Sequence, residues 1–279
     1  MLKSYCKINL SLRVLKKLKN GLHDIETNSL LISTHDTIKI IKIKKRNDKI
    51  IFTGKFRRSV KMLKNTVLET MKILRQKKII NKNKKYRIVV NKKIPAFSGL
   101  GGGTSNAVFI LKYFFKKNIN NSIINEFDKK IGSDFRIFLQ KQAYQKSLKI
   151  FKGYKNFLKL YFVIVYPNIK CSTKSIYSKV KNYSKNSKID PTKIKTKDRF
   201  ISFLKREKND LQDITVSKFS KLNLILNFIS IQKDCYFSRM TGSGSACFGM
   251  FKSKKSAIAG LKIIKTKFPK YWCVFAKTI

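Results

Sequence analysis

Acidic residues are scarce in this sequence: its 279 residues include only 14 aspartates and glutamates, against 64 lysines and arginines. The formal net charge of +50 raises the hypothesis of a nucleic-acid-binding protein. Arginine, whose planar fork recognises phosphates and bases better than lysine does, accounts for only ten of these cations. Because the lysines are spread along the whole chain, we favour a codon bias toward AT-rich sequence over a dedicated nucleic-acid surface.

Cysteine is also scarce, with five scattered residues that form no Cys-x-x-Cys pair. This spacing argues against a disulfide framework or a structural zinc site and favours a reducing cytoplasm. No uninterrupted apolar run reaches the length of a membrane span. Because Lys3, Lys7 and Arg13 interrupt an alternating N-terminus, we expect no signal peptide and predict a cytoplasmic protein without a membrane segment.

Hydrophobic periodicity indicates strands first and mixed helices and strands later, the pattern of an α+β fold. The expected strands of an antiparallel β region lie at 6–14, 26–34, 37–45 and 48–54. A polar, lysine-rich stretch at 182–198 is typical of a surface loop. The pattern breaks near 152–158, and we therefore predict an N-terminal domain over 1–154 and a C-terminal domain over 155–279.

Four of the 12 glycines fall within "PAFSGLGGGTSNA", residues 95–107, which we call the glycine loop. Glycines let a ligand approach the backbone closely, and we expect a strand before the loop and an apolar helix, capped by Thr104 or Ser105, after it. A helix N-terminus favours an anion, most often phosphate. The spacing matches neither a Walker A loop nor the GxGxxG fingerprint, and a mobile loop remains the structural alternative.

The glycine loop resembles the P-x-x-x-G-L-G-G-G-S-S-N-A loop of the GHMP small-molecule kinases. Within that superfamily, the chain is most similar to the family of kinases that act on 4-diphosphocytidyl-2-C-methyl-D-erythritol. Further segments match in order: KINLSL at 7–12, NGLHDIET at 20–27, IGSDFRIF at 131–138, RMTGSGSACFGMF at 239–251 and, more weakly, YPNIKCSTKSIY at 166–177. The resemblance implies a two-lobed α+β fold with a ribosomal-protein-like N-terminal lobe and a ferredoxin-like C-terminal lobe.

The resemblance also implies a reaction. ATP and Mg²⁺ would bind between the lobes, and the γ-phosphate would pass to the 2-hydroxyl of 4-CDP-2-C-methyl-D-erythritol, on the non-mevalonate route to isoprenoid precursors. The expected partner is this small molecule, for a monomer or homodimer, and specific nucleic-acid binding is not expected. Two alternatives stay open: another GHMP kinase, of the homoserine or mevalonate type, and a basic nucleic-acid-binding protein that reuses the fold.

The resemblance assigns catalytic roles to Lys7 and Asp134. Local sequence alone favours a helix cap for Asp134, after its Gly-Ser turn, and a solvated strand residue for Lys7. The resemblance instead makes Asp134 the general base that removes the hydroxyl proton. It places the Lys7 ammonium beside that carboxylate, where it would stabilise the developing alkoxide.

The other implied site residues bind ATP or the substrate, and no metal ligand is assigned. The ATP set is Asn65, Pro95, Ser98, Gly99, Leu100, Gly101, Gly102, Gly103, Thr104 and Ser105. The substrate set is Asn9, His23, Thr173, Tyr177, Gly242, Ser243 and Gly244. Asn65 is otherwise a helix cap, and Tyr177 otherwise a core aromatic. The family's aromatic before the histidine is Leu22 here, so one side of the cytosine-binding site is lost or supplied from elsewhere.

Overall fold

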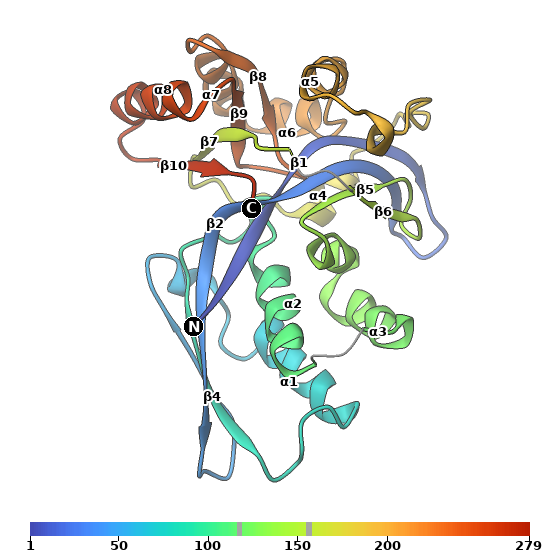
Figure 1. The fold of residues 1–279 in the computed structure, drawn as a ribbon, viewed down its shortest axis with the longest axis vertical. Helices are drawn as coiled ribbons and strands as arrows, with labels where there is room; N and C mark the ends of the chain where they lie inside the picture. Colours follow the sequence, from blue (N-terminus) through green and yellow to red (C-terminus); the bar gives the residue numbers. More distant parts are fainter. Residues whose placement is uncertain (116–118, 155–157) are drawn as a thin grey trace. The chain divides into compact units, whose positions relative to one another are not determined.

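The computed structural model describes residues 1–115, 119–154 and 158–279 and divides into two compact units (Figure 1). Unit 1 comprises Met1–Cys6, Thr34–Ala96 and Gly101–Leu139, and unit 2 comprises Lys7–Ser33, Phe97–Leu100 and Gln140–Ile279. The units are discontinuous because two long strands, β1 (Leu2–Lys17) and β2 (His23–Ile43), pass from one into the other. The division at residues 154 and 155 stays a prediction, and 155–157 lie outside the described residues.

Unit 1 contains a small sheet whose central strand is β4 (Lys85–Asn91). This strand pairs antiparallel with residues 37–43 of β2 and parallel with β3 (Lys49–Thr53). The prediction of a purely antiparallel region is therefore wrong. The reason is that α1 (Thr66–Gln76) lies between β3 and β4 in the chain, and such a helical crossover lets both strands run in the same direction.

Helices complete unit 1. Its helical elements are η1 (Arg57–Ser59), α1, α2 (Gly102–Phe114), α3 (Asn121–Ile131) and η2 (Ser133–Leu139). α1 buries Val67, Met71 and Leu74, which lie on one face at helical spacing, and it packs against α2. α2 is therefore held within unit 1 by its packing against α1.

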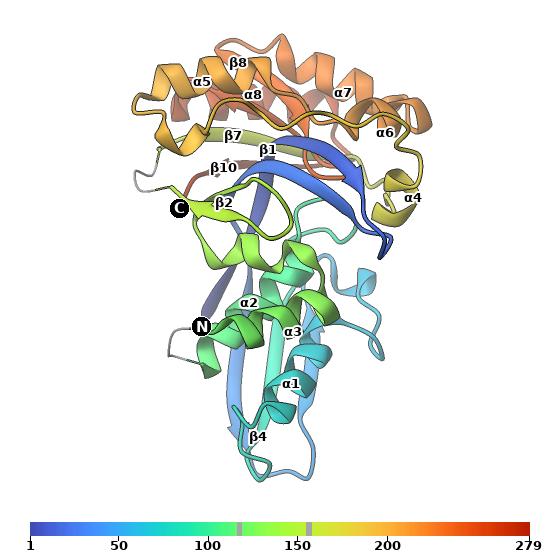
Figure 2. The same cartoon turned by 90° about the vertical axis from the view of Figure 1, so that its right-hand side faces the viewer.

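Unit 2 contains a four-stranded antiparallel sheet in the order β10–β7–β9–β8. The strands are β7 (Tyr161–Tyr166), β8 (Cys235–Met240), β9 (Cys247–Phe251) and β10 (Trp272–Lys277). α7 (Lys221–Ser230) and α8 (Lys254–Lys267) pack against these strands (Figure 2). This β-α-β-β-α-β order is the ferredoxin-like topology, so the predicted C-terminal architecture is confirmed.

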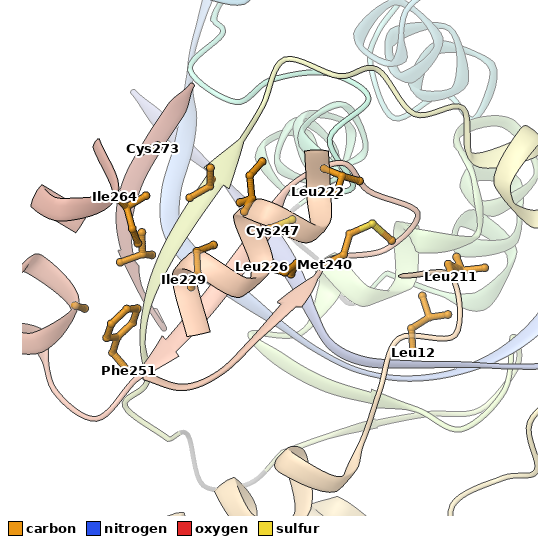
Figure 3. Close-up of a cluster of buried hydrophobic side chains, with 14 of the residues drawn as sticks. Leu12, Leu211, Leu222, Leu226, Ile229, Met240, Cys247, Phe251, Ile264 and Cys273 are labelled. Atoms are coloured by element: carbon orange, nitrogen blue, oxygen red, sulfur yellow. The ribbon is translucent and has the colours of Figure 1, made fainter. Parts of the chain in front are cut away.

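Apolar side chains of α7 and the sheet form the core of unit 2. Leu222, Leu226 and Ile229 recur at helical spacing on α7 and are buried together with Met240 and Cys247 of the strands (Figure 3). This packing anchors the end of β8 immediately before the small-residue turn "TGSG". Among the described residues, no helix is both long and apolar enough to cross a bilayer.

Shorter elements complete unit 2. They are β5 (Gln142–Gln145), β6 (Phe151–Gly153), α4 (Thr173–Tyr177), η3 (Pro191–Lys193), α5 (Lys197–Arg206) and α6 (Gln212–Lys218). β5 pairs antiparallel with residues 27–30 of β2 and with β6. The polar stretch predicted at 182–198 is irregular through residue 190, and α5 then begins at Lys197.

Candidate active site

The first part of the glycine loop, Ser98–Leu100, belongs to unit 2 and lies against "TGSG", residues 241–244, which we call the TGSG segment. The N–H of Ala246 donates to the carbonyl oxygen of Ser98 at 3.0 Å. Gly99 has a φ of 80°, and a Cβ at this position would lie 2.1 Å from the carbonyl oxygen of Thr241. Only glycine therefore allows the two backbones to approach this closely.

The second part of the loop begins α2 in unit 1. Gly101, with a φ of 67°, is the N-cap, and the helix begins at Gly102. The prediction of Thr104 or Ser105 as the cap is therefore wrong, because the left-handed backbone of Gly101 turns the chain into the helix earlier. The N–H groups of the first turn have no acceptor within the helix, and the positive end of the helix dipole favours an anion there.

The two hydroxyl residues after these glycines differ in their surroundings. Ser105 is fully buried, and its Oγ donates to the carbonyl oxygen of Tyr5 at 2.5 Å and lies 2.7 Å from Ser4 Oγ. Thr104 is partly exposed. Thr104 is thus the hydroxyl that a ligand at the helix N-terminus can reach, whereas the Ser105 side chain holds α2 to β1.

A buried carboxylate, Asp36, holds the backbone at the entry to the loop. It accepts hydrogen bonds from the N–H groups of Lys93 and Ile94, at 2.7 and 2.9 Å, and pairs with the Lys92 ammonium. These bonds fix the chain directly before Pro95. Sequence reasoning did not single out Asp36, although an aspartate within an otherwise apolar β region is the signal that could have found it.

Asn65 is the N-cap of α1. Its side-chain oxygen accepts a hydrogen bond from the N–H of Leu68 at 2.9 Å, so the helix-cap interpretation is confirmed. Thr66 Oγ1 donates to the carbonyl oxygen of Gly103 at 2.8 Å and ties the start of α1 to the glycine loop. The contact of Asn65 with adenine stays a prediction.

Asp134 lies in the first turn of η2, directly after the Gly-Ser turn, and is partly exposed. The Arg136 guanidinium pairs with Asp128 and donates to Asn125 Oδ1 at 2.6 Å. Both partners lie on α3, so this arginine connects η2 to that helix. The role of Asp134 as general base stays a prediction.

Lys7 is buried on β1, so the interpretation as a solvated strand residue is wrong. Its ammonium donates to Asn9 Oδ1, and its N–H donates to the carbonyl oxygen of Leu100 at 3.1 Å. Asn9 in turn donates both amide hydrogens, to Thr27 Oγ1 at 2.9 Å and to Ser29 Oγ at 3.0 Å. The two-residue period of the strand places Lys7 and Asn9 on one face, as expected, and the hydroxyls of β2 then fix the amide.

Residue Asn209, which sequence reasoning missed, holds the TGSG segment. Its Nδ2 donates to the carbonyl oxygens of Met240 and Gly242, both at 2.8 Å. The segment then reaches two predicted site residues. Ser243 Oγ lies 3.0 Å from Thr173 Oγ1, and a Cβ built at Gly242 would lie 3.4 Å from Lys7 Nζ.

Arg239 is a second residue that sequence reasoning missed. Its buried guanidinium donates to the carbonyl oxygens of Leu10, Leu204 and Glu207 and thereby connects β8, β1 and the end of α5. Burial lowers the pKa of Arg239 to about 10, and the nearby Glu207 carboxylate opposes that shift. An arginine beside an apolar strand pattern is the sequence signal for such a clamp.

His23 begins β2, and its imidazole is partly buried. The ring of Tyr177, on α4, lies 5.0 Å from it between centroids. Burial lowers the pKa of His23, and the positive charge of Lys17 lowers it further, so the neutral imidazole is favoured. A neutral imidazole offers one hydrogen-bond donor and one acceptor.

The predicted site residues divide between the units. Unit 1 holds Asn65, Pro95, Gly101, Gly102, Gly103, Thr104, Ser105 and Asp134. Unit 2 holds Lys7, Asn9, His23, Ser98, Gly99, Leu100, Thr173, Tyr177, Gly242, Ser243 and Gly244. Within unit 2, hydrogen bonds or ring contacts join Lys7 with Asn9, Thr173 with Ser243, and His23 with Tyr177.

Comparisons with known proteins agree with this arrangement. The GHMP kinases N-terminal domain model matches residues 65–139, and the GHMP kinases C-terminal model matches residues 198–270. The class defined by both matches is therefore that of the GHMP kinases.

Sequence similarity to individual enzymes identifies one family within this class. The 4-diphosphocytidyl-2-C-methyl-D-erythritol kinase of Pelagibacter ubique is 38% identical, over 100% of this chain and 98% of its own length. The enzyme of the same name from Buchnera aphidicola is 32% identical over 91% of this chain and 85% of its own length. The chain belongs to the family of 4-diphosphocytidyl-2-C-methyl-D-erythritol kinases, one branch of the GHMP kinases.

Solved structures share the fold. A 4-(cytidine 5'-diphospho)-2C-methyl-D-erythritol kinase aligns with a TM-score of 0.74 and 19% identity, over 99% of this chain and 98% of that one. Homoserine kinase from Cytophaga hutchinsonii aligns with a TM-score of 0.67 and 12% identity, over 100% and 96%. Identities this low show the fold alone. The homoserine-type, mevalonate-type and nucleic-acid-binding alternatives are therefore not favoured over the family with full-length sequence similarity.

Proposed function

We propose that this chain transfers the γ-phosphate of ATP to the 2-hydroxyl of 4-CDP-2-C-methyl-D-erythritol. The observation that carries the proposal is the full-length similarity, at 38% identity, to a kinase named for that substrate. Phosphoryl transfer of this kind needs a phosphate-binding site, a group that removes the hydroxyl proton and cations that balance developing charge. The residues described above can supply the first two and part of the third.

The N-terminus of α2 binds the phosphates of ATP. Its first-turn N–H groups lack acceptors within the helix, and the partly exposed Thr104 adds a hydroxyl. Mg²⁺ fits this donor set, because it is usually held by one or two protein oxygens together with substrate phosphates. Thr104 Oγ1 is the protein oxygen that would hold it. When bound, the ion neutralises phosphate charge.

Proton transfer falls to Asp134, which accepts the proton of the 2-hydroxyl as general base. The Lys7 ammonium stabilises the negative charge that develops on that oxygen. The role that we assign to Asn9 differs from the one that the resemblance implies. Because its amide hydrogens are donated to Thr27 and Ser29, we assign Asn9 to orienting the Lys7 ammonium and not to binding the erythritol hydroxyls.

Recognition of the cytidyl group falls to His23 and its aromatic neighbour Tyr177. The neutral imidazole can both donate to and accept from the edge of a base, and the phenol ring offers a flat apolar surface. The hydroxyls of Thr173 and Ser243, 3.0 Å apart, supply donors suited to the diphosphate. In this proposal, the residues that recognise the base are different from those that carry out phosphoryl transfer.

The test is an assay of ATP consumption and product formation with Mg²⁺ and 4-CDP-2-C-methyl-D-erythritol, with homoserine and mevalonate as competing acceptors. We expect turnover with the cytidyl alcohol alone. We expect Asp134→Asn to lower kcat by about 100- to 10,000-fold, the usual contribution of a general base. The matched control is Asp213→Asn, because Asp213 is an exposed carboxylate on α6. Equal turnover with homoserine or mevalonate, or an Asp134→Asn variant as active as the control, would contradict the proposal.

A further inference from the structure

An aromatic residue from elsewhere in the chain lies near His23. Leu22, 49% exposed, directly precedes His23, and its side chain supplies no ring. The ring of Tyr183 lies 6.4 Å from the His23 ring between centroids, and the two planes differ by 33°. Tyr177 also contacts this imidazole, at 5.0 Å. His23 thus has aromatic neighbours from two separate segments of unit 2.

Hydrogen bonds hold the segment after Tyr183 against β1 and β2. The N–H of Ser184 donates to the carbonyl oxygen of Val14 at 2.8 Å. The buried carboxylate of Glu26 accepts from Asn186 Nδ2 at 2.8 Å and from the N–H of Ser187 at 3.0 Å. Although residues 182–190 form no helix or strand, the backbone that carries Tyr183 is therefore anchored beside the start of β2.

The Tyr183 side chain is only partly covered by the rest of the protein. It is 45% exposed, although an aromatic ring that serves the core is normally buried. The half-exposed Tyr183 ring beside a partly exposed, neutral imidazole combines flat apolar surface with one donor and one acceptor. A flat heterocycle with a hydrogen-bonding edge, which is the chemistry of a nucleobase, matches this combination.

We propose that Tyr183 is a base-binding residue that packs against the cytosine ring and supplies the aromatic surface that Leu22 lacks. The inference rests on the proposed function, because that function names the cytidyl substrate. Stacking is tolerant of base identity, since every base has a π-face. Tyr183 therefore contributes affinity for the base, whereas selection of cytosine over uracil depends on hydrogen bonds from His23.

The experiment titrates CDP and UDP into the full-length protein and three variants. Tyr183→Ala removes the ring, and Tyr183→Phe keeps it. The matched control is Tyr113→Ala, because Tyr113 is 41% exposed on α2. We expect Tyr183→Ala to raise the Kd of CDP about 5- to 20-fold and that of UDP by the same factor. The phenylalanine and control variants should stay within about twofold of the wild type.

Kinetics supply the second measurement. In Tyr183→Ala we expect a higher KM for 4-CDP-2-C-methyl-D-erythritol, by the same 5- to 20-fold, with the KM for ATP and kcat within about twofold. The inference is overturned if Tyr183→Ala binds CDP like the wild type. It is also overturned if affinity for ATP falls equally, because the change would then report damage to the fold.

Failure of the inference and failure of the proposed function give different results. If the wild type turns over the cytidyl alcohol and Tyr183→Ala leaves CDP affinity unchanged, only the role of Tyr183 is refuted. If CDP binds and Tyr183→Ala weakens it, but no cytidyl alcohol is phosphorylated, the reaction is refuted and base binding stands. A wild type that neither binds CDP nor turns over the cytidyl alcohol refutes both.

Discussion

Asn209 offers a direct test of how the TGSG segment is held in place. The Asn209 side chain is 4% exposed, and it makes three hydrogen bonds to backbone groups of unit 2. It donates to the carbonyl oxygens of Met240 and Gly242, both at 2.8 Å, and accepts from the N–H of Leu211 at 3.0 Å. Asn209→Ala removes all three bonds at once and leaves two carbonyls and one N–H without this partner.

The expected loss of stability follows from these three groups. A buried polar group that loses its partner costs about 1–3 kcal/mol, and water entering the vacated space offsets part of that cost. We therefore expect Asn209→Ala to lower the free energy of unfolding by about 3–5 kcal/mol. Asn209→Asp keeps the acceptor for Leu211 but places a carboxylate oxygen against two carbonyl oxygens, so we expect at least the same loss.

Urea unfolding measures the loss, and steady-state kinetics report its effect on the site. The control is Asn223→Ala, on the exposed face of α7, which should stay within about 0.5 kcal/mol of the wild type. Because Gly242 and Ser243 belong to the substrate set, KM for the cytidyl substrate should rise while KM for ATP changes less. An Asn209→Ala protein as stable as the control would refute the reasoning.

Two further predictions concern the glycine loop and the imidazole. We expect Gly99→Ala to destabilise the protein by several kcal/mol and to abolish activity, because its Cβ would collide with the Thr241 carbonyl. The control is Gly153→Ala, outside the predicted site, which should be tolerated because its Cβ would meet only the flexible Gln140 side chain. Urea unfolding and activity assays distinguish the two variants, and equal behaviour would contradict the close approach at Gly99. In an NMR titration of the two histidines, we expect His23 to have a pKa below its ordinary value, and we expect Lys17→Gln to raise that pKa. Because protonation is disfavoured in the folded state, the protein should lose stability as pH falls from 6.5 through the pKa of folded His23. An unshifted pKa would contradict this prediction.

Strong periodicity predicted much of the fold, and weak periodicity failed. The apolar faces of α1 and α7 repeat clearly at helical spacing, and this is the pattern that predicts a helix. α5 was missed, because its buried residues Phe200, Phe203 and Leu204 stand among charged residues. The parallel direction of β3 could not be predicted, since it depends on which strand it pairs with and not on its own residues.

In the candidate site, too, some features could be predicted from the sequence and others could not. Short local motifs indicated the glycine loop, the TGSG segment and His23, because their composition is unusual in this chain. The N-cap at Gly101 lies three or four residues before the predicted caps Thr104 and Ser105, since a left-handed glycine can replace a side-chain cap. Asn209 and Tyr183 were not singled out, because an isolated asparagine or tyrosine has many ordinary explanations.

The sequence by itself determined the chemistry that is available: glycines where backbones must approach, Lys7 in an alternating strand, and an aspartate after a Gly-Ser turn. The tertiary structure decided which hydrogen-bonding groups already have partners within the protein. The groups to which Asn9 donates lie 18, 20 and 232 residues away along the chain, and they leave its side-chain amide no hydrogen to donate to a ligand. Hydrogen-bond capacity is a property of the neighbours that folding brings together, so only the folded chain distinguishes a residue that binds a ligand from one that orients another residue.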